Sequence, residues 1–115
     1  ADLTVLSEKC LLMTYGIRNR GLMGIGVRIS IDGGTNWRPP WVIHQFGPEA
    51  KDIGYPSTVL LDKKGNLLTA FYTDYEPSLK KKPNRYRVLA KKWSLKDWLH
   101  PSIIDSISDG KQLKI

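Results

Sequence analysis

The sequence predicts an all-β chain of two four-stranded antiparallel units with a short tail. Apolar residues alternate with polar or small ones over residues 27–31, which is the period-two pattern of a half-buried strand. Gly33 and Gly34 follow at once, and glycines adopt the positive φ of a tight hairpin turn without steric cost. The pattern then restarts, because Thr-Val-Leu at residues 4–6 recurs at residues 58–60. This repeat of roughly 54 to 57 residues has the length of one small sheet.

The composition is that of an ordinary globular domain. The chain has 115 residues, of which 41% are hydrophobic and 25% charged, and no apolar run is long enough to span a membrane. The start of the chain opens directly into a strand pattern, so we expect no signal peptide there, and the compartment is left open. The formal charge of +7 favours anionic partners, the alternative being a solvated basic surface.

Cysteine and histidine give no sign of a metal or cofactor site. Cys10 is the single cysteine, so it forms no internal disulfide, and we expect a small turn or core residue. His44 and His100 are far apart and have no cysteine partner at metal-ligand spacing. We therefore predict no metal and no cofactor.

The first unit is expected to contain four strands, at residues 3–6, 11–15, 27–30 and 41–44. The segment 16–26 is rich in glycine and arginine and is predicted to be a loop with some strand character at its end. Residues 46–55 are predicted to connect the two units.

The second unit is expected to contain three clear strands, at residues 58–61, 67–72 and 85–93. Asp62 is predicted to be a hairpin turn residue, and residues 75–83 a polar, basic loop. The tail from residue 94 forms a short helix, capped by Ser102 and ended by Gly110, or completes the second unit.

One turn carries a recognisable motif. Ser30, Asp32, Gly34 and Trp37 have the spacing Ser-x-Asp-x-Gly-x-x-Trp. We expect Ser30 to bond back across the turn, Asp32 to accept backbone N–H groups, and Trp37 to pack beneath it. The motif resembles the Asp-box, or bacterial neuraminidase repeat, of the sialidase superfamily. In that family the box is structural and lies on the outer rim of a β-propeller blade, so the resemblance implies two propeller blades.

The resemblance continues in the family's order through four further segments, at residues 12–18, 26–30, 52–59 and 65–72. It implies a first blade over about residues 1–54, a second over about residues 55–99, and a tail over residues 100–115. Propellers have about four to eight blades, and two blades alone leave faces uncovered. The chain is therefore expected to be part of a larger six-bladed propeller or to form a homo-oligomer, with a trimer of two-bladed copies favoured.

The same resemblance suggests site residues. Sialidases use a tyrosine nucleophile, and Tyr55 stands at the family's position, at the start of the final blade's first strand. The family holds the substrate carboxylate with three arginines. The resemblance implies these substrate-binding candidates: Arg18 and Arg20, less favourably Arg28, and the pocket tyrosines Tyr15 and Tyr72.

Two departures limit the resemblance. The family commonly has serine after the nucleophile and an acidic residue after the second strand's tyrosine, whereas this chain has Pro56 and Thr73, with Asp74 one place later. The activating glutamate, the acid/base aspartate and two arginines would lie in blades that this chain lacks. We therefore expect a module that recognises carbohydrate, such as a sialoside or another acidic glycan, and leave open exo-α-sialidase activity with the missing blades supplied. The alternatives are a lectin-like binder and a purely structural or interaction module.

Simpler roles compete for these residues. Tyr55 can pack at the start of a strand, and Arg18 and Arg20 can be solvated loop charges. The basic run at residues 80–87 could bind phosphates with Tyr86 stacking on a base, but a charge run in a hairpin loop is usually a solvated tip. Without a nucleic-acid-binding motif, we expect no nucleic-acid partner.

Overall fold

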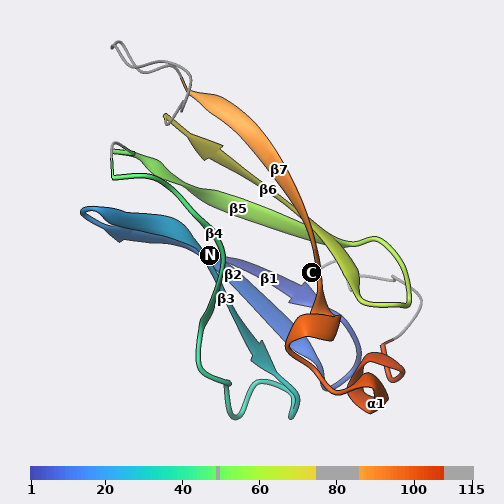
Figure 1. Ribbon diagram of the computed structural model, residues 1–115. Coiled ribbons are helices and arrows are strands. Elements are labelled where there is room, and N and C mark those ends of the chain that lie inside the picture. The colour runs from blue at the N-terminus through green and yellow to red at the C-terminus, as the bar shows by residue number, and fades with distance from the viewer. Residues whose placement is uncertain (49, 75–85, 108–115) are drawn as a thin grey trace.

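The computed structural model describes residues 1–48, 50–74 and 86–107, which form two antiparallel sheets (Figure 1). The first sheet has the order β1-β2-β3-β4, with β1 at Asp2–Val5, β2 at Leu11–Asn19, β3 at Leu22–Ser30 and β4 at Trp41–Gln45. The second has the order β5-β6-β7, with β5 at Ile53–Leu60, β6 at Asn66–Thr73 and β7 at Arg87–Ser94. A 3₁₀ helix, η1 at Leu95–Asp97, and a short helix, α1 at Pro101–Ile104, follow. The all-β prediction is confirmed, and the second sheet has three described strands where four were predicted.

The predicted loop at residues 16–26 is wrong. β2 and β3 continue through this segment, and the chain reverses at Gly21, whose φ is +80°. Glycine here marks close packing within strands, because a Cβ on Gly24 would lie 2.6 Å from the carbonyl oxygen of His44 on β4. Composition suggested a loop because a glycine that allows close packing of a neighbouring strand cannot be distinguished in the sequence from a glycine in a turn.

The predicted turn after β3 is confirmed. The Ser30 hydroxyl accepts the Gly34 N–H at 2.8 Å and donates to the Asp32 carboxylate at 2.8 Å. Asp32 also accepts the backbone N–H and the side-chain amide of Asn36, at 2.9 and 2.8 Å. The Trp37 indole N–H donates to the Gly34 carbonyl at 3.1 Å. These bonds, those from Asn36 first and then that from Ser30, lower the pKa of Asp32 to about 2.

A second turn of the same kind joins β5 and β6. Asp62 accepts the backbone N–H of Asn66 at 3.2 Å, its side-chain amide at 2.7 Å, and the Lys64 N–H at 2.8 Å. Gly65 within this turn has a φ of +85°. Asp62 is therefore the turn residue that the sequence predicted. Both turns share an aspartate that binds an asparagine four positions later.

The tail forms helices shorter than expected. η1 covers three residues and α1 covers four. His100, rather than Ser102, caps α1, because its ring nitrogen accepts the Ser102 N–H at 3.1 Å and Pro101 follows at the first helical position. Gly110 and the basic loop at residues 75–83 lie outside the described residues. No helix among the described residues is long and apolar enough to cross a membrane.

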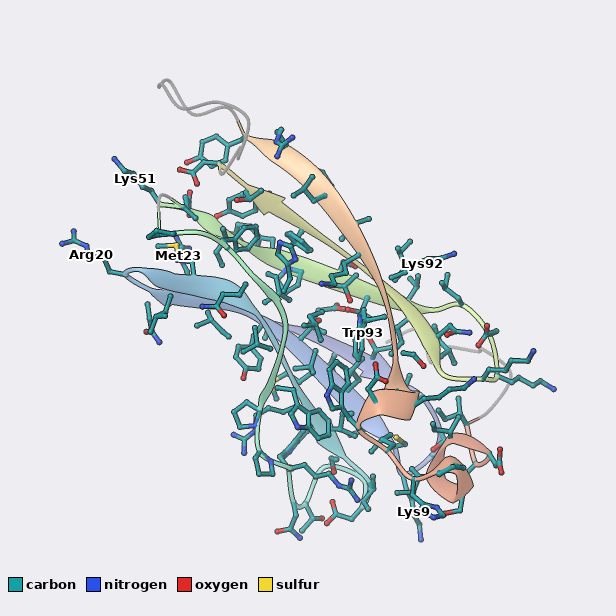
Figure 2. All side chains as sticks on the ribbon, in the orientation of Figure 1. Lys9, Arg20, Met23, Lys51, Lys92 and Trp93 are labelled. Carbon is teal, nitrogen blue, oxygen red and sulfur yellow. The ribbon has the colours of Figure 1, made fainter. Side chains whose placement is uncertain are left out.

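The core lies between the two sheets, where β5 packs against β1 and β2. Aromatic side chains cover the core on the β4 side. The ring of Trp41 stacks on that of Trp98 with their centroids 5.2 Å apart, and the centroids of Trp98 and Trp93 are also 5.2 Å apart. Figure 2 shows Trp93 among the side chains between the sheets. The fully buried core residues include Leu6, Leu12, Ile25, Val27, Ile29, Ile53, Leu67 and Leu95.

A chain of hydroxyl groups crosses this core. The Trp93 indole donates to the Thr69 hydroxyl at 2.8 Å, which lies 2.8 Å from the Thr58 hydroxyl. Thr58 in turn donates to the Thr14 hydroxyl at 3.2 Å. A hydroxyl carries one proton, and Thr58 uses it on Thr14, so Thr69 must donate to Thr58. The bonds therefore run in one direction from β7 through β6 and β5 to β2.

We expect Thr58→Val to lower the free energy of unfolding by about 1–3 kcal/mol, since valine keeps the shape but leaves the buried Thr69 hydroxyl without its acceptor. Urea denaturation measures this change. Thr35→Val at an exposed turn position is the control and should change stability by less than about 0.5 kcal/mol. An unchanged midpoint for Thr58→Val would show that the hydroxyl chain does not stabilise the sheet contact.

Candidate functional site

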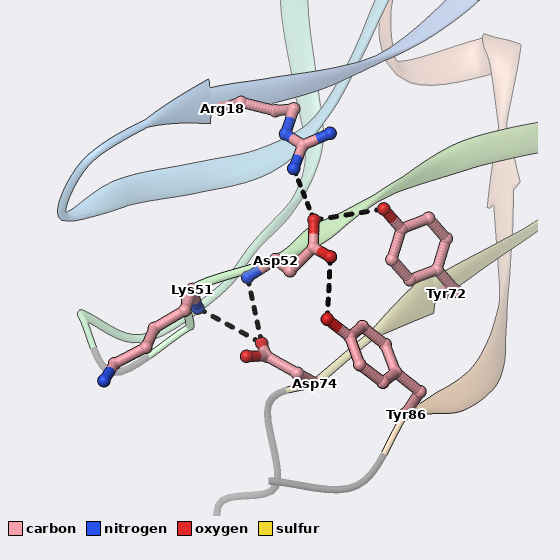
Figure 3. Close-up of polar contacts among 6 residues, drawn as sticks. All are labelled: Arg18, Lys51, Asp52, Tyr72, Asp74 and Tyr86. Atoms are coloured by element: carbon pink, nitrogen blue, oxygen red, sulfur yellow. Dashed lines mark hydrogen bonds and ion pairs between the residues drawn. The ribbon is translucent and has the colours of Figure 1, made fainter.

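Asp52, just before β5, is the centre of a polar cluster that combines residues from both sheets (Figure 3). Its Oδ1 forms an ion pair with the Arg18 guanidinium on β2 and accepts the Tyr72 hydroxyl of β6 at 3.0 Å. Its Oδ2 accepts the Tyr86 hydroxyl, just before β7, at 2.8 Å. We call these four residues the Asp52 cluster.

Asp74 holds the backbone beneath this cluster. Its Oδ1 accepts the N–H groups of Lys51 and Asp52, both at 3.1 Å, and its own N–H donates to the Asp52 carbonyl at 3.1 Å. Asp74 is 4% exposed. The end of β6 and the start of β5 are thus tied together by both backbone and side chain, which positions the Asp52 carboxylate.

The hydrogen bonds of the cluster separate the pKa values of its acid and its phenols. The Tyr86 hydroxyl, followed by Tyr72 and the charge of Arg18, lowers the pKa of Asp52. The bond to Asp52 raises the pKa of Tyr86. Partial burial, and then the bond to Asp52, raises the pKa of Tyr72. At neutral pH the carboxylate is therefore ionised, and both phenols direct their protons toward it.

Tyr55 lies beside the cluster and is directed into solvent. It is 85% exposed, and its ring centroid lies 5.4 Å from that of Tyr72. Its φ is +47°, a conformation that costs a non-glycine residue roughly 1–2 kcal/mol. The register of β5 shifts between Gly54 and Ser57, and this bulge turns Tyr55 outward. Strain of this kind is concentrated at functional sites, which marks Tyr55 as a candidate.

The structure brings three of the predicted site residues together and leaves a fourth nearby. Arg18 and Tyr72 both bind Asp52, and Tyr55 contacts Tyr72. Arg20 lies in the exposed turn between β2 and β3, next to the cluster.

Tyr15 and Arg28 lie on the other face of the first sheet. Side chains alternate along β2, so Tyr15 and Arg18 point to opposite faces. Arg28 donates through Nε to the Arg38 carbonyl at 3.0 Å, in the segment that leads away from the Asp32 turn. Neither residue joins the Asp52 cluster.

Sequence reasoning missed Asp52 and Tyr86 as site residues. Asp52 lies within a segment that resembles the family, but the resemblance gives it no role. Tyr86 was considered as a ligand contact only within the basic run at residues 80–87. The register of β6 and β7 carries the missing signal, because it pairs Thr73 with Arg87 and so places residue 86 at the end of β6. Sequence alone does not reveal that register, because no tight-turn motif near these strands fixes which residues pair.

Other ionisable residues give no second catalytic centre in the described part of the chain. His44 packs edge-on against Phe46 at 4.7 Å, and partial burial, then Lys91, lowers its pKa. Cys10 is buried, which raises the pKa of its thiol. No group of three histidine, cysteine or carboxylate side chains able to hold a metal ion occurs among the described residues.

Comparison of the chain with protein-family models, with curated proteins and with solved structures found no match in any of the three.

We expect Asp52→Asn to lower the pKa values of Tyr72 and Tyr86, because a neutral amide no longer favours their protonated forms. The measurement is an ultraviolet titration of the tyrosines, with Tyr72→Phe and Tyr86→Phe used to assign the high-pH component. Asp62→Asn, in the turn between β5 and β6, is the matched control and should leave the curve unchanged. A titration curve of Asp52→Asn identical to that of the unsubstituted protein would contradict the described cluster.

Proposed function

We propose that the chain is a sialidase-like module that recognises acidic glycans, with Arg18, Tyr55 and the Asp52 cluster as its binding site. The observation that carries the proposal is the meeting of an arginine and three tyrosines, supplied by β2 and by the second sheet, at one solvent-accessible position. The resemblance in sequence points to Arg18, Tyr55 and Tyr72, and their proximity in space supports that interpretation.

Arg18 is suited to bind a carboxylate. Its ion pair with Asp52 orients the guanidinium, while 57% of the side chain remains exposed. A planar guanidinium presents several N–H donors along its edges, so one N–H can bind Asp52 while others donate to a ligand carboxylate. Orientation before binding reduces the conformational entropy lost when the ligand is held.

The three tyrosines supply the rest of the surface. The ring centroids of Tyr55 and Tyr72 are 5.4 Å apart, and those of Tyr72 and Tyr86 are 5.8 Å apart. Tyrosine offers a large, rigid and amphipathic contact area with few rotatable bonds, which suits a ligand that has both apolar faces and hydroxyl groups.

Binding is better supported than catalysis. A phenol is a weak nucleophile and needs a base or a strong positive field. In residues 1–48, 50–74 and 86–107, no side chain forms a hydrogen bond with the Tyr55 hydroxyl, and Arg18 is already paired with Asp52. Exo-sialidase activity is therefore the second candidate, dependent on acidic groups from other blades, and the strained, exposed Tyr55 is the observation that favours it.

We further propose that the two sheets are propeller blades. Each has its strands in sequential order, and the sheets stack face to face. Their outer faces carry exposed apolar side chains, with Leu3 and Val42 on the first sheet 49% and 52% exposed, and Val59 and Val88 on the second 42% and 75% exposed. A blade in a propeller covers both faces, so these surfaces fit other blades. Three copies of the chain would form a six-bladed ring, and a longer propeller is the alternative.

We expect the protein to bind sialyllactose and to bind lactose more weakly, since only the former carries a carboxylate for Arg18. Arg18→Gln and Tyr55→Ala should each lower the affinity about tenfold, as measured by calorimetric titration. Arg28→Gln is the matched control, because Arg28 lies on the other face of the first sheet. Equal affinity for the two sugars, or an equal loss with Arg28→Gln, would refute the assigned site.

A fluorogenic sialoside assay with Tyr55→Phe tests the second candidate, exo-sialidase activity.

Light scattering should give a mass three times the 13.1 kDa of the chain if copies complete the ring. Val88→Glu should yield monomers, because it places a charge on the exposed apolar face of the second sheet. Ile31→Glu, 38% exposed in the turn after β3, is the control and should leave the mass unchanged. A monomeric mass at every concentration would rule out self-assembly.

A further inference from the structure

A pocket of about 600 Å³ lies next to the Asp52 cluster. It forms between the turn from β2 to β3 and the connection from β4 to β5. Its lining includes Arg18, Arg20, Met23, Pro48, Ala50 and Lys51. Figure 2 shows Arg20, Met23 and Lys51 at this end of the molecule. We call it the basic pocket.

The lining of the basic pocket combines an apolar surface with cations. Met23, Pro48 and Ala50 supply the apolar part. Arg20 and Lys51 are exposed and supply its positive charge. Within the described part of the chain, neither Arg20 nor Lys51 forms an ion pair. Two cations beside an apolar surface attract an anionic group that also has an apolar face.

Arg18 joins the basic pocket to the Asp52 cluster. It lines the pocket and also pairs with Asp52, so a ligand that reaches Arg18 from the tyrosines can extend into the pocket. In the proposed site, Arg18 alone is assigned to the carboxylate of the first acidic sugar. The proposed site therefore gives no role to the additional charges of Arg20 and Lys51.

We infer that the basic pocket binds a second acidic group of the same glycan, so that the preferred ligand is an oligosaccharide with at least two carboxylates. This inference rests on the proposed function, because Arg18 and the tyrosines are taken to hold the first acidic sugar. Arg20 and Lys51 bind the second carboxylate, and Met23 with Pro48 contacts the carbon skeleton that links the two.

The test compares sialyllactose, which has one carboxylate, with disialyllactose, which has two. We expect disialyllactose to bind about tenfold more tightly. In a chemical-shift titration, the amide signals of Gly21 and Ala50 should move with disialyllactose and stay in place with sialyllactose. The double substitution Arg20→Gln and Lys51→Gln should abolish the difference in affinity and leave the binding of sialyllactose unchanged.

The control removes the same charge elsewhere, through Lys92→Gln and Lys96→Gln on β7 and η1, and should preserve both affinities. Equal binding of the two sugars by the unsubstituted protein would overturn the basic-pocket inference and leave the proposed function intact. Equal losses in the pocket variant and the control variant would also overturn it, since they indicate unspecific charge attraction. Absence of binding to both sugars would overturn the proposed function and this inference together.

Discussion

The contact between β5 and the first sheet is the constraint on which the rest of the structure depends. The Thr58 N–H donates to the Asp2 carboxylate at 2.9 Å, and the Thr4 hydroxyl donates to the Thr58 carbonyl at 3.3 Å. Both backbone groups of Thr58, its N–H and its carbonyl, therefore bind side chains of β1. These bonds are directional, so they determine how the sheets align along their strands, whereas apolar packing alone would tolerate sliding.

That alignment positions the candidate site. Arg18 comes from the first sheet, while Asp52, Tyr72 and Tyr86 come from segments of the second. Sliding one sheet past the other by one residue would move Arg18 about 3.3 Å along the strand direction and separate it from Asp52. The buried hydroxyl chain and the exposed ionic cluster are thus two consequences of one sheet contact.

The site combines satisfied polar groups with local strain. Asp52 and Asp74 satisfy their carboxylates with backbone and side-chain donors, so hydrogen bonds tie the start of β5 to the end of β6. Tyr55 follows in a left-handed conformation and is largely exposed. The favourable bonds around it stabilise a conformation that the residue would avoid by itself, a combination that suits recognition of a ligand.

The sequence by itself determined the local structure. Period-two alternation predicted strands, and Asp32 and Asp62 marked turns, because these signals arise between residues a few positions apart. It did not determine that Gly24 and Gly26 lie within a strand, since a Cβ would meet the His44 carbonyl oxygen at Gly24 and the Tyr15 ring at Gly26, both on neighbouring strands. Only the tertiary structure decided that Asp52 meets Arg18 and Tyr86, because contacts 34 positions apart depend on how sheets pack and on strand register.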